Sequence, residues 1–535
     1  MADRPWWETA VIYQIYPRSF QDSTGDGVGD LAGVIGRLDY LGETLGIDAI
    51  WLSPFFPSPM KDFGYDVSDY CDVEPLFGDL AIFDRLVAEA HERDLKVIID
   101  WVPNHTSDQH PWFIESRSSR SNPKRDWYVW RNGKPDGAPP NNWTADFGGG
   151  SWQWDEPTGQ YYLHSFLKEQ PDLNWRNPEV ESAMLETLRF WLDRGVDGFR
   201  IDVAHRIMKD PDLSDNPLVA GIEDSTEVTA YAAQHHINDR GHPDVHEVFR
   251  RIRAVLEEYQ PPRFSIGEIH EHHWPTWASY YGTNLDGLHM PYNFAILETP
   301  WTARDIRALV EKVEEVVPRG AWPNYVLGNH DEIRIATRLG TDQERIAAML
   351  LLTLRGTPTL YYGDEIGLGQ ADIPPELQQD PWGRNVPGRG RDGCRTPMQW
   401  TDVDGAGFTD PGVRPWLRVS DDYRTRNVDA LLSVADSLTN LYRKLLAVRH
   451  REPALQAGGY RSLEARQGVF AYRRDDGRSQ WAIALNFTGN AQPPGSIFAN
   501  GSGNVTISTR LDRRGPVALA ELELRPHEGV IVRLD

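Results

Sequence analysis

Short apolar runs alternate with longer amphipathic segments along most of this chain. A continuous apolar run favours a strand buried on both faces of a parallel sheet, whereas apolar residues spaced three and four apart favour a helix. Strands are predicted over residues 11–15, 49–52, 96–100 and 198–202 and near residues 264, 288, 325 and 358. Helices are predicted over residues 31–41, 80–92, 180–192 and 431–449. This alternation predicts an α/β fold of the (β/α)8 TIM-barrel class.

Two polar segments interrupt the alternation, and the pattern changes near the end of the chain. Residues 105–174 are rich in Pro, Gly, Asn and Trp, and we expect a subdomain inserted after strand 3, over the barrel mouth. Residues 365–425 carry turn signals and predict a loop at the rim. Hairpin-like runs after residue 454 predict a C-terminal antiparallel β domain. The expected domains are 1–104 (barrel, first part), 105–174 (inserted subdomain), 175–454 (barrel, second part) and 455–535 (C-terminal β domain).

Composition narrows the class of protein. The chain has 535 residues, 40% of them hydrophobic, which is enough for a large core. Its net charge of −24 argues against nucleic acids and anionic membranes as partners. Only Cys71 and Cys394 occur, so the sequence predicts no disulfide framework. It shows neither a signal peptide at its start nor an apolar run long enough for a membrane span. We therefore expect a cytoplasmic protein.

Four predicted strands lead into an acidic side chain at or just beyond their carboxyl ends. These side chains are Asp100, Asp202, Glu268 and Asp331. In a barrel of parallel strands the reactive groups lie at this end. One such carboxylate would be interpreted as a cap or an ion-pair partner. Four of them, interleaved with further polar side chains, predict one active site assembled from distant segments.

Paired carboxylates without metal-ligand spacing suit the cleavage of a glycosidic bond. Arg200 stands two residues before Asp202, projects to the same face of the strand and favours the ionised, nucleophilic form of that carboxylate. Glu268 has no adjacent cation and suits the role of a protonated acid. Asp331 would bind sugar hydroxyls and favour a cationic transition state.

Several segments, taken together, are highly specific. They are Asp100-Trp-Val-Pro-Asn104-His105, Gln170-Pro-Asp-Leu-Asn174, Gly198-Phe-Arg-Ile-Asp202, Gly267-Glu268, Asn329-His330-Asp331 and Arg391-Asp-Gly-Cys-Arg-Thr-Pro-Met-Gln-Trp400. Over essentially its full length the sequence resembles the α-amylase family, glycoside hydrolase family 13, and within it the oligo-1,6-glucosidase and α-glucosidase branch.

The resemblance implies Asp202 as nucleophile, Glu268 as acid/base and Asp331 as transition-state stabiliser, with retention of the α configuration. The nucleophile and acid carboxyls are then expected about 5–5.5 Å apart. It also implies a pocket for the terminal sugar, closed at its far side, in which Asp66 pairs with Arg391. The residues that the resemblance assigns to substrate binding are Tyr65, Asp66, His105, Phe147, Phe166, Gln170, Arg200, His330 and Arg391.

A loop over residues 22–30 alternates oxygen-bearing side chains with glycines, which suits a hard cation such as Ca²⁺. The resemblance implies a structural calcium site here, with Asp22, Thr24, Asp26, Val28 and Asp30 as its ligands. The family usually has Asn where this chain has Thr24, which predicts weaker binding. Residues 270–273 hold three histidines, which we interpret as a polar rim beside Glu268 rather than as a metal site. No organic cofactor is expected.

The leading hypothesis is an exo-acting hydrolase that removes glucose from short α-glucosides, working as a monomer or homodimer. A second hypothesis is a transglucosylase or isomerase of the sucrose isomerase or trehalose synthase type, which shares the barrel and the three acids. A third is a non-catalytic relative, which the intact acids disfavour. Val203 follows the nucleophile, and in this branch Val at that position tends to accompany α-1,6 activity, which favours tolerance of α-1,6 linkages.

Overall fold

The computed structural model describes residues 4–219, 230–466, 468–493 and 501–535. Its centre is an eight-stranded parallel sheet in the order β10-β11-β1-β2-β3-β7-β8-β9. The strands are β1 (Ile12–Ile15), β2 (Ala49–Leu52), β3 (Lys96–Trp101), β7 (Gly198–Ile201), β8 (Phe264–Gly267), β9 (Met290–Pro291), β10 (Asn324–Val326) and β11 (Thr357–Tyr361). All the predicted barrel strands are present, and the predicted fold class is confirmed.

The sheet curls into a nearly closed barrel, and one side chain bridges its two end strands. β9 contributes only two residues, one of which is Pro291 and has no amide proton to donate. Asn324 of β10 donates from its amide nitrogen to the carbonyl oxygen of Pro291, and its amide oxygen accepts from the backbone of Asn293 at 3.0 Å. A side-chain amide thus joins β10 to the end of β9 in place of a backbone ladder.

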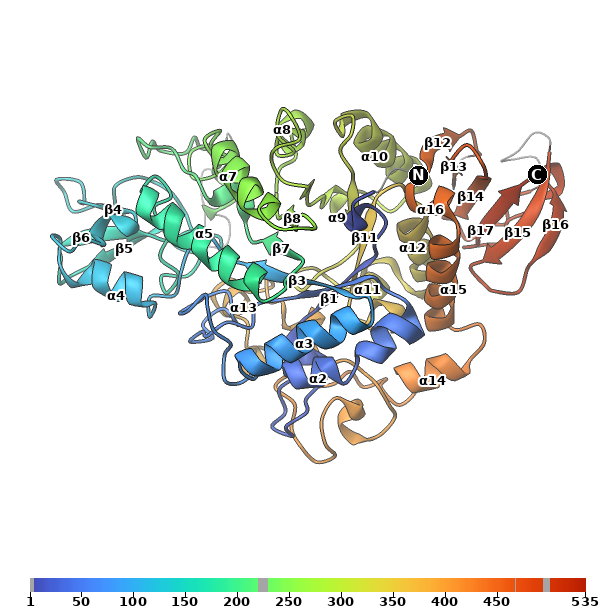
Figure 1. The fold of residues 1–535 in the computed structure, drawn as a ribbon, viewed down its shortest axis with the longest axis horizontal. Helices are drawn as coiled ribbons and strands as arrows, with labels where there is room; N and C mark the ends of the chain where they lie inside the picture. Colours follow the sequence, from blue (N-terminus) through green and yellow to red (C-terminus); the bar gives the residue numbers. More distant parts are fainter. Residues whose placement is uncertain (1–3, 220–229, 467, 494–500) are drawn as a thin grey trace.

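Helices cover the outside of the barrel (Figure 1). The longer ones have an apolar face that packs against the strands, as the spacing of their buried residues requires. The helices before the last barrel strand are α1 (Pro17–Phe20), α2 (Leu31–Ile35), α3 (Leu80–Glu92), α4 (Pro111–Ser118), α5 (Pro178–Asp193), α7 (Val245–Glu257), α8 (Trp274–Ser279), α9 (Ala295–Glu298), α10 (Ala303–Val316), α11 (Ile335–Leu339) and α12 (Thr341–Thr353). Those after it are α13 (Pro381–Asn385), α14 (Val428–Ser433), α15 (Leu438–Arg451) and α16 (Pro453–Ala457).

Two predicted helices are shorter or broken in the structure. The helix expected over residues 31–41 ends at Ile35, and a π-helical turn follows over Tyr40–Leu45. The helix expected over residues 431–449 is two helices, because Ser437 caps a new start by accepting from the backbone of Asn440. Apolar spacing continues through both breaks, which explains why periodicity alone missed them.

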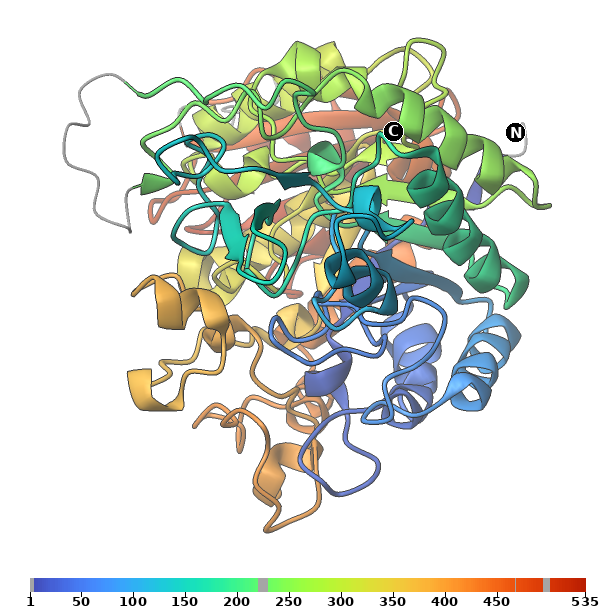
Figure 2. The ribbon, with the colours of Figure 1, turned by 90° about the vertical axis from the view of Figure 1, so that its left-hand side faces the viewer.

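The segment between β3 and α5 carries a small antiparallel sheet of its own. Its strands are β4 (Trp130–Arg131), β5 (Trp152–Asp155) and β6 (Gln160–Leu163), in the order β4-β6-β5. This sheet lies at one end of the molecule (Figure 1), and Figure 2 looks onto that end, with the sheet in front of the barrel. The segment follows the carboxyl end of β3, so it adds walls to the mouth of the barrel.

A six-stranded antiparallel sheet closes the chain at the opposite end of the molecule (Figure 1). Its strands are β12 (Gly459–Leu463), β13 (Val469–Asp475), β14 (Gln480–Asn486), β15 (Ser502–Ser508), β16 (Gly515–Ala518) and β17 (Gly529–Leu534). Buried Arg474 joins this sheet to the barrel by donating to the carbonyl oxygens of Thr353 at 2.6 Å and Gly458 at 2.9 Å. Within the described residues, no helix has both the length and the apolar character needed to cross a membrane.

Candidate active site

Arg200 is the centre of the acidic cluster. It lies on β7, is 2% exposed and places its guanidinium inside the mouth of the barrel. One nitrogen, Nη1, contacts Asp100 and Asp202 at 2.7 Å each, and Nη2 contacts Glu268 at 2.7 Å. The carboxylates that end β3, β7 and β8 therefore converge on one cation, as the positions of the strand ends predicted.

Glu268 is held on both of its oxygens. Oε2 accepts a hydrogen bond from the backbone N–H of Val203 at 2.9 Å, and Oε1 lies 2.9 Å from Nε2 of His270. Val203 has φ 34°, in the left-handed region that a β-branched residue rarely adopts. This strained backbone directs the amide after Asp202 at Glu268, so one turn couples the two carboxyl groups.

The two carboxyls titrate as a pair. Burial raises the pKa of Asp202, and Glu268 and Asp100 add to that effect while Arg200 opposes it. Burial also disfavours the ionised form of Glu268, but Arg200 and His270 outweigh it and lower the pKa of Glu268. Since both carboxyls contact one guanidinium and repel each other, the second ionisation of the pair has a raised pKa, and the pair retains a shared proton to a higher pH than an isolated carboxyl would.

Asp331 follows β10 and contacts a different set of groups, two of which are cations. Its Oδ1 lies 3.0 Å from both Arg391 and Arg395, and its Oδ2 lies 3.2 Å from Nε2 of His330. Burial alone would raise the pKa of Asp331, but His330, Arg391 and Arg395 outweigh it and lower this pKa well below the ordinary value. Asp331 is therefore ionised at any working pH.

Arg391 closes the far end of the pocket, and its partner differs from the predicted one. It contacts Asp62 and Asp380 at 2.7 Å each. The predicted pairing with Asp66 is wrong. Asp66 is fully buried and stabilises a turn by accepting from the Ser58 hydroxyl and from two backbone amides. The segment over residues 62–66 holds an acid at each end, and only the first faces Arg391.

The remaining predicted binding residues gather around this end. Gln170 lies behind the wall and donates to Asp62 at 3.2 Å and contacts His105 at 3.1 Å. The hydroxyl of Tyr65 lies 2.6 Å from Nε2 of His330. Burial lowers the pKa of His105 to about 4 and that of His330 to about 3, so both imidazoles are neutral. Neutral imidazoles can donate and accept hydrogen bonds to sugar hydroxyls without adding charge.

These side chains line one cavity of about 660 Å³, a volume that suits a small sugar. Phe147 and Phe166 form an aromatic wall, with ring centroids 5.3 Å apart, and the guanidinium of Arg391 lies over the ring of Phe147. The predicted residues that line the cavity are Tyr65, His105, Phe147, Phe166, Asp202, Glu268, His330, Asp331 and Arg391. Arg200, Gln170 and Asp66 lie outside this lining.

Sequence reasoning missed some residues of the cavity. Asp62 belongs to it, as do Arg206 and Trp382, which come from segments with no strand signal. Arg206 lies beyond the nucleophile and pairs with Asp146 at 2.7 Å, and Trp382 stacks on Phe147 with centroids 5.2 Å apart. A second acid beside the Gly64-Tyr65 turn was the signal that could have revealed Asp62.

The loop over residues 22–30 is closed by its own hydrogen bonds. Asp22 accepts from the amides of Thr24, Gly25 and Gly27 and from the hydroxyl of Thr409. Asp30 accepts from Ser23 and caps α2 through the amide of Gly33. Within the described ranges, no three His, Cys, Asp or Glu side chains are grouped so as to hold a metal ion. Calcium binding in this loop stays a prediction.

The comparisons with known proteins agree with this geometry. Residues 14–458 match the family model for the alpha amylase catalytic domain. The chain belongs to the α-amylase family, glycoside hydrolase family 13. It is similar to a probable alpha-glucosidase of Rhizobium meliloti (strain 1021), with 44% identity over 91% of this chain and 90% of that protein. It is also similar to an oligo-1,6-glucosidase of Parageobacillus thermoglucosidasius, with 39% identity over 99% of both chains.

Solved structures extend the comparison across the whole chain. An alpha-glucosyl transfer enzyme, XgtA, has a TM-score of 0.91 and 42% sequence identity, with 100% of both chains covered. A mutant isomaltulose synthase from Erwinia rhapontici NX5, solved with sucrose, has a TM-score of 0.89 and 33% identity over 100% of both chains. This family 13 chain therefore shares its complete architecture with an alpha-glucosyl transfer enzyme and an isomaltulose synthase.

Proposed function

We propose that this family 13 enzyme is a retaining, exo-acting α-glucosidase that releases terminal glucose from short α-glucosides, linked α-1,4, α-1,6 or both. The observation that carries the proposal is the contact of one guanidinium, that of Arg200, with both Asp202 and Glu268 at the mouth of the barrel. Relatives named alpha-glucosidase and oligo-1,6-glucosidase over at least nine tenths of this chain support it.

In the proposed reaction Asp202 attacks the anomeric carbon of the terminal glucose. Glu268 gives its proton to the glycosidic oxygen as that bond breaks, which leaves a glucosyl ester on Asp202. A water molecule then loses a proton to Glu268 and attacks the same carbon, which frees Asp202 and releases glucose with its configuration retained. Ionised Asp331 contacts the sugar hydroxyls and stabilises the positive charge that develops on the ring.

The first step requires the shared proton of the carboxyl pair to be on Glu268. Glu268 must give a proton to the leaving oxygen, whereas Asp202 must be ionised to attack the anomeric carbon. Nε2 of His270 lies 2.9 Å from Oε1 of Glu268, and this contact stabilises the carboxylate that remains once the proton has passed to the leaving oxygen. We therefore place the proton on Glu268 in the substrate complex.

The closed end of the pocket supports the exo-acting part of the proposal. Arg391, Asp62 and Asp331 form a charged network across that end, at contacts of 2.7 and 3.0 Å. A terminal glucose presents free hydroxyls to such a network, whereas an internal glucose carries a further sugar there. The charged groups bind free hydroxyls through strong hydrogen bonds. They leave no room for the further sugar that an internal glucose carries.

The test compares initial rates on maltose, isomaltose, sucrose and trehalose for the wild type and for Asp202→Asn. We expect the variant to lose at least about a thousandfold in kcat, because the amide cannot act as the nucleophile. Asp84→Asn is the matched control, since Asp84 pairs with Arg194 on the outer surface of the barrel. Equal rates in the wild type and Asp202→Asn would overturn the proposal.

A second candidate is a transglucosylase or isomerase, favoured by the 42% identity with an alpha-glucosyl transfer enzyme over the whole chain. Both functions share the glucosyl ester and differ in the acceptor that attacks it. Product analysis on sucrose and maltose separates them, because a hydrolase accumulates free glucose and a transferase accumulates new disaccharides or longer chains.

Three further predictions accompany the proposal. Calcium in the loop over residues 22–30, a cytoplasmic location and a monomeric or homodimeric state follow from the sequence and the family resemblance. The free thiols of Cys71 and Cys394 agree with a reducing compartment.

A further inference from the structure

We propose that His270 sets the acid strength of Glu268 and directs the proton of that acid toward the glycosidic oxygen. This inference deepens the proposed glucosidase function and rests on it. His270 is a positioning residue, because it acts on the substrate only through Glu268. It stands two residues after Glu268, on the loop that follows β8, and its side chain is 40% exposed in the wall of the active-site cavity.

The two carboxyl oxygens of Glu268 have different partners. Oε2 accepts from the backbone N–H of Val203 at 2.9 Å and lies 2.7 Å from Nη2 of Arg200. An oxygen that already accepts from two donors is a poor place for a proton, because the hydrogen of a hydroxyl there would face one of those donors. Oε1 has a single partner among the described residues, Nε2 of His270 at 2.9 Å. The proton of the acid therefore belongs on Oε1.

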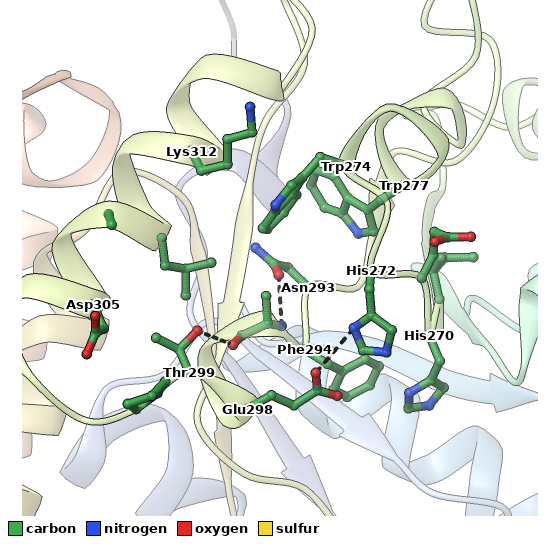
Figure 3. A pocket seen from close by; sticks show the side chains of 16 residues that line it. His270, His272, Trp274, Trp277, Asn293, Phe294, Glu298, Thr299, Asp305 and Lys312 are labelled. Atoms are coloured by element: carbon green, nitrogen blue, oxygen red, sulfur yellow. Dashed lines mark hydrogen bonds and ion pairs between the residues drawn. The ribbon is translucent and has the colours of Figure 1, made fainter. Parts of the chain in front are cut away.

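An aromatic ring holds the imidazole of His270 in place. The ring of Phe294 lies parallel to it, with an interplanar angle of 3° and a centroid distance of 4.6 Å, and Figure 3 shows the two rings side by side. When Nε2–H donates to one lone pair of Oε1, the hydroxyl hydrogen of the protonated acid takes the remaining direction. That direction leads into the cavity that Glu268 lines, where the glycosidic oxygen lies in the proposed reaction.

The charge of His270 acts in the same sense as its position. Burial favours the neutral imidazole, but the hydrogen bond to Glu268 and the charge of that carboxylate outweigh burial and raise the pKa of His270 above its usual value. Burial alone would raise the pKa of Glu268, but Arg200 and His270 outweigh it and lower this pKa. A stronger acid transfers its proton more readily to a leaving oxygen, as long as it is still protonated at the working pH.

Other titratable groups face His270 from neighbouring segments, and none of them can replace it. These groups are His205, Arg206, Arg240 and Glu332. The two arginines oppose protonation of His270, whereas Glu332 favours it. Burial keeps His205 neutral by lowering its pKa well below the usual value. Among the titratable side chains of the described residues, only Arg200 and His270 contact the carboxyl of Glu268, and a guanidinium is always charged. His270 is therefore the contact whose charge can change with pH.

The test compares the pH dependence of kcat/KM in the wild type and in His270→Gln, on maltose and on p-nitrophenyl α-D-glucopyranoside. Loss of the cation raises the pKa of Glu268, so we expect the basic limb of both profiles to move up by about one pH unit. At the optimum, kcat/KM on maltose should fall about tenfold, because a sugar must be protonated as it leaves. On the nitrophenyl glucoside it should fall less than about threefold, because nitrophenolate can leave without a proton.

His272→Gln is the matched control. His272 lies on the same loop, but its Nδ1 is 3.2 Å from Glu298 and it makes no contact with the Glu268 carboxyl within the described residues (Figure 3). This variant should leave the basic limb in place. A basic limb of His270→Gln that stays in place or moves to lower pH, or equal losses on the two glucosides, would overturn the role of His270.

A wild type that releases no glucose from either glucoside would contradict the proposed function instead. NMR titration of the histidine Cε1–H groups then still tests the contact, with the His270 signal assigned by its absence in His270→Gln. We expect the pKa of His270 to fall by about one unit in Glu268→Gln, because the neutral amide no longer favours the imidazolium. An unchanged pKa of His270 would reject the inference.

Discussion

At the scale of single residues, the site depends on which of two neighbouring acids faces the pocket. Asp62 and Asp66 are both buried, and the resemblance pointed to the second. Asp62 pairs with Arg391, whose position in the sequence lies 329 residues away, whereas Asp66 binds only its own turn. No local pattern distinguishes the two, because the difference lies in a contact that only the folded barrel creates.

Asp62→Asn should impair substrate binding, and Asp66→Asn should impair only folding. Loss of the Asp62 carboxylate removes a charged hydrogen-bond acceptor beside Arg391, so we expect kcat/KM on maltose to fall roughly ten- to hundredfold. Asp66→Asn keeps one acceptor oxygen in the turn and should lower the melting temperature while kcat/KM of the folded enzyme stays within about twofold. Steady-state kinetics and thermal unfolding of both variants check this, and the opposite pattern would restore Asp66 to the site.

Val203→Thr should shift linkage preference. Val203 lines the pocket next to Asp202, and Thr has the same shape, so the strained backbone at φ 34° and the amide contact to Glu268 are preserved. A hydroxyl in place of a methyl changes the polarity beside the leaving sugar. This change can alter the difference in transition-state free energy between the two linkages by about 1–3 kcal/mol at most. We expect the ratio of kcat/KM for isomaltose over maltose to fall by up to about tenfold. A ratio that rises or stays constant would contradict the assignment of linkage preference to this side chain.

At the scale of elements, the sequence predicts the barrel well because each strand carries its own signal. Asp100, Asp202 and Glu268 were placed correctly since a buried apolar run ends at each of them, and parallel strands bring such ends to one edge. Trp382 and Arg206 could not be found in the same way. They reach the pocket from a short helix and from a turn, where neither periodicity nor strand ends fix the direction of a side chain.

Breaks inside helices were missed for a related reason. The chain over residues 431–449 keeps its apolar spacing across the end of α14 and the start of α15, and the cap at Ser437 decides the outcome. Capping is a contact of one side chain with one amide, so it is visible in sequence only as a common serine.

The loop between α1 and α2 gives a prediction about calcium. Thr24 stands where the family usually has Asn, and its hydroxyl contacts Asp22 at 3.3 Å instead of offering a carbonyl oxygen. We expect millimolar Ca²⁺ to raise the melting temperature of Thr24→Asn by more than it raises that of the wild type, because an amide oxygen is the better ligand. Scans in Ca²⁺ and in a chelator check this for both proteins. Equal shifts would mean that position 24 does not contribute a ligand.

At the scale of the whole molecule, the protein contains carboxyl groups whose pKa values burial raises close to neutral pH. Burial raises the pKa of Asp100 to about 6 and that of Asp364 and Glu344 to about 7. Each therefore holds its proton in the folded protein at pH values where the unfolded chain, with a carboxyl pKa near 4, has lost it. This contribution to the free energy of unfolding is complete below about pH 4 and is lost as the pH rises toward 7.

Asp364→Asn should remove one such contribution without changing the shape of the side chain. Asp364 follows β11, is 6% exposed and accepts from the backbone of Tyr361 at 2.9 Å, a bond that an amide oxygen can also accept. The melting temperature of the variant, relative to wild type, should therefore increase between pH 5 and pH 8. Buried neutral histidines such as His105 and His330 act with the opposite sign below about pH 6.5 and would obscure the trend in the wild type alone. These histidines are present in both proteins, so their contributions cancel in the difference between the two melting temperatures. If that difference does not change with pH, Asp364 ionises in the folded protein as freely as in the unfolded chain.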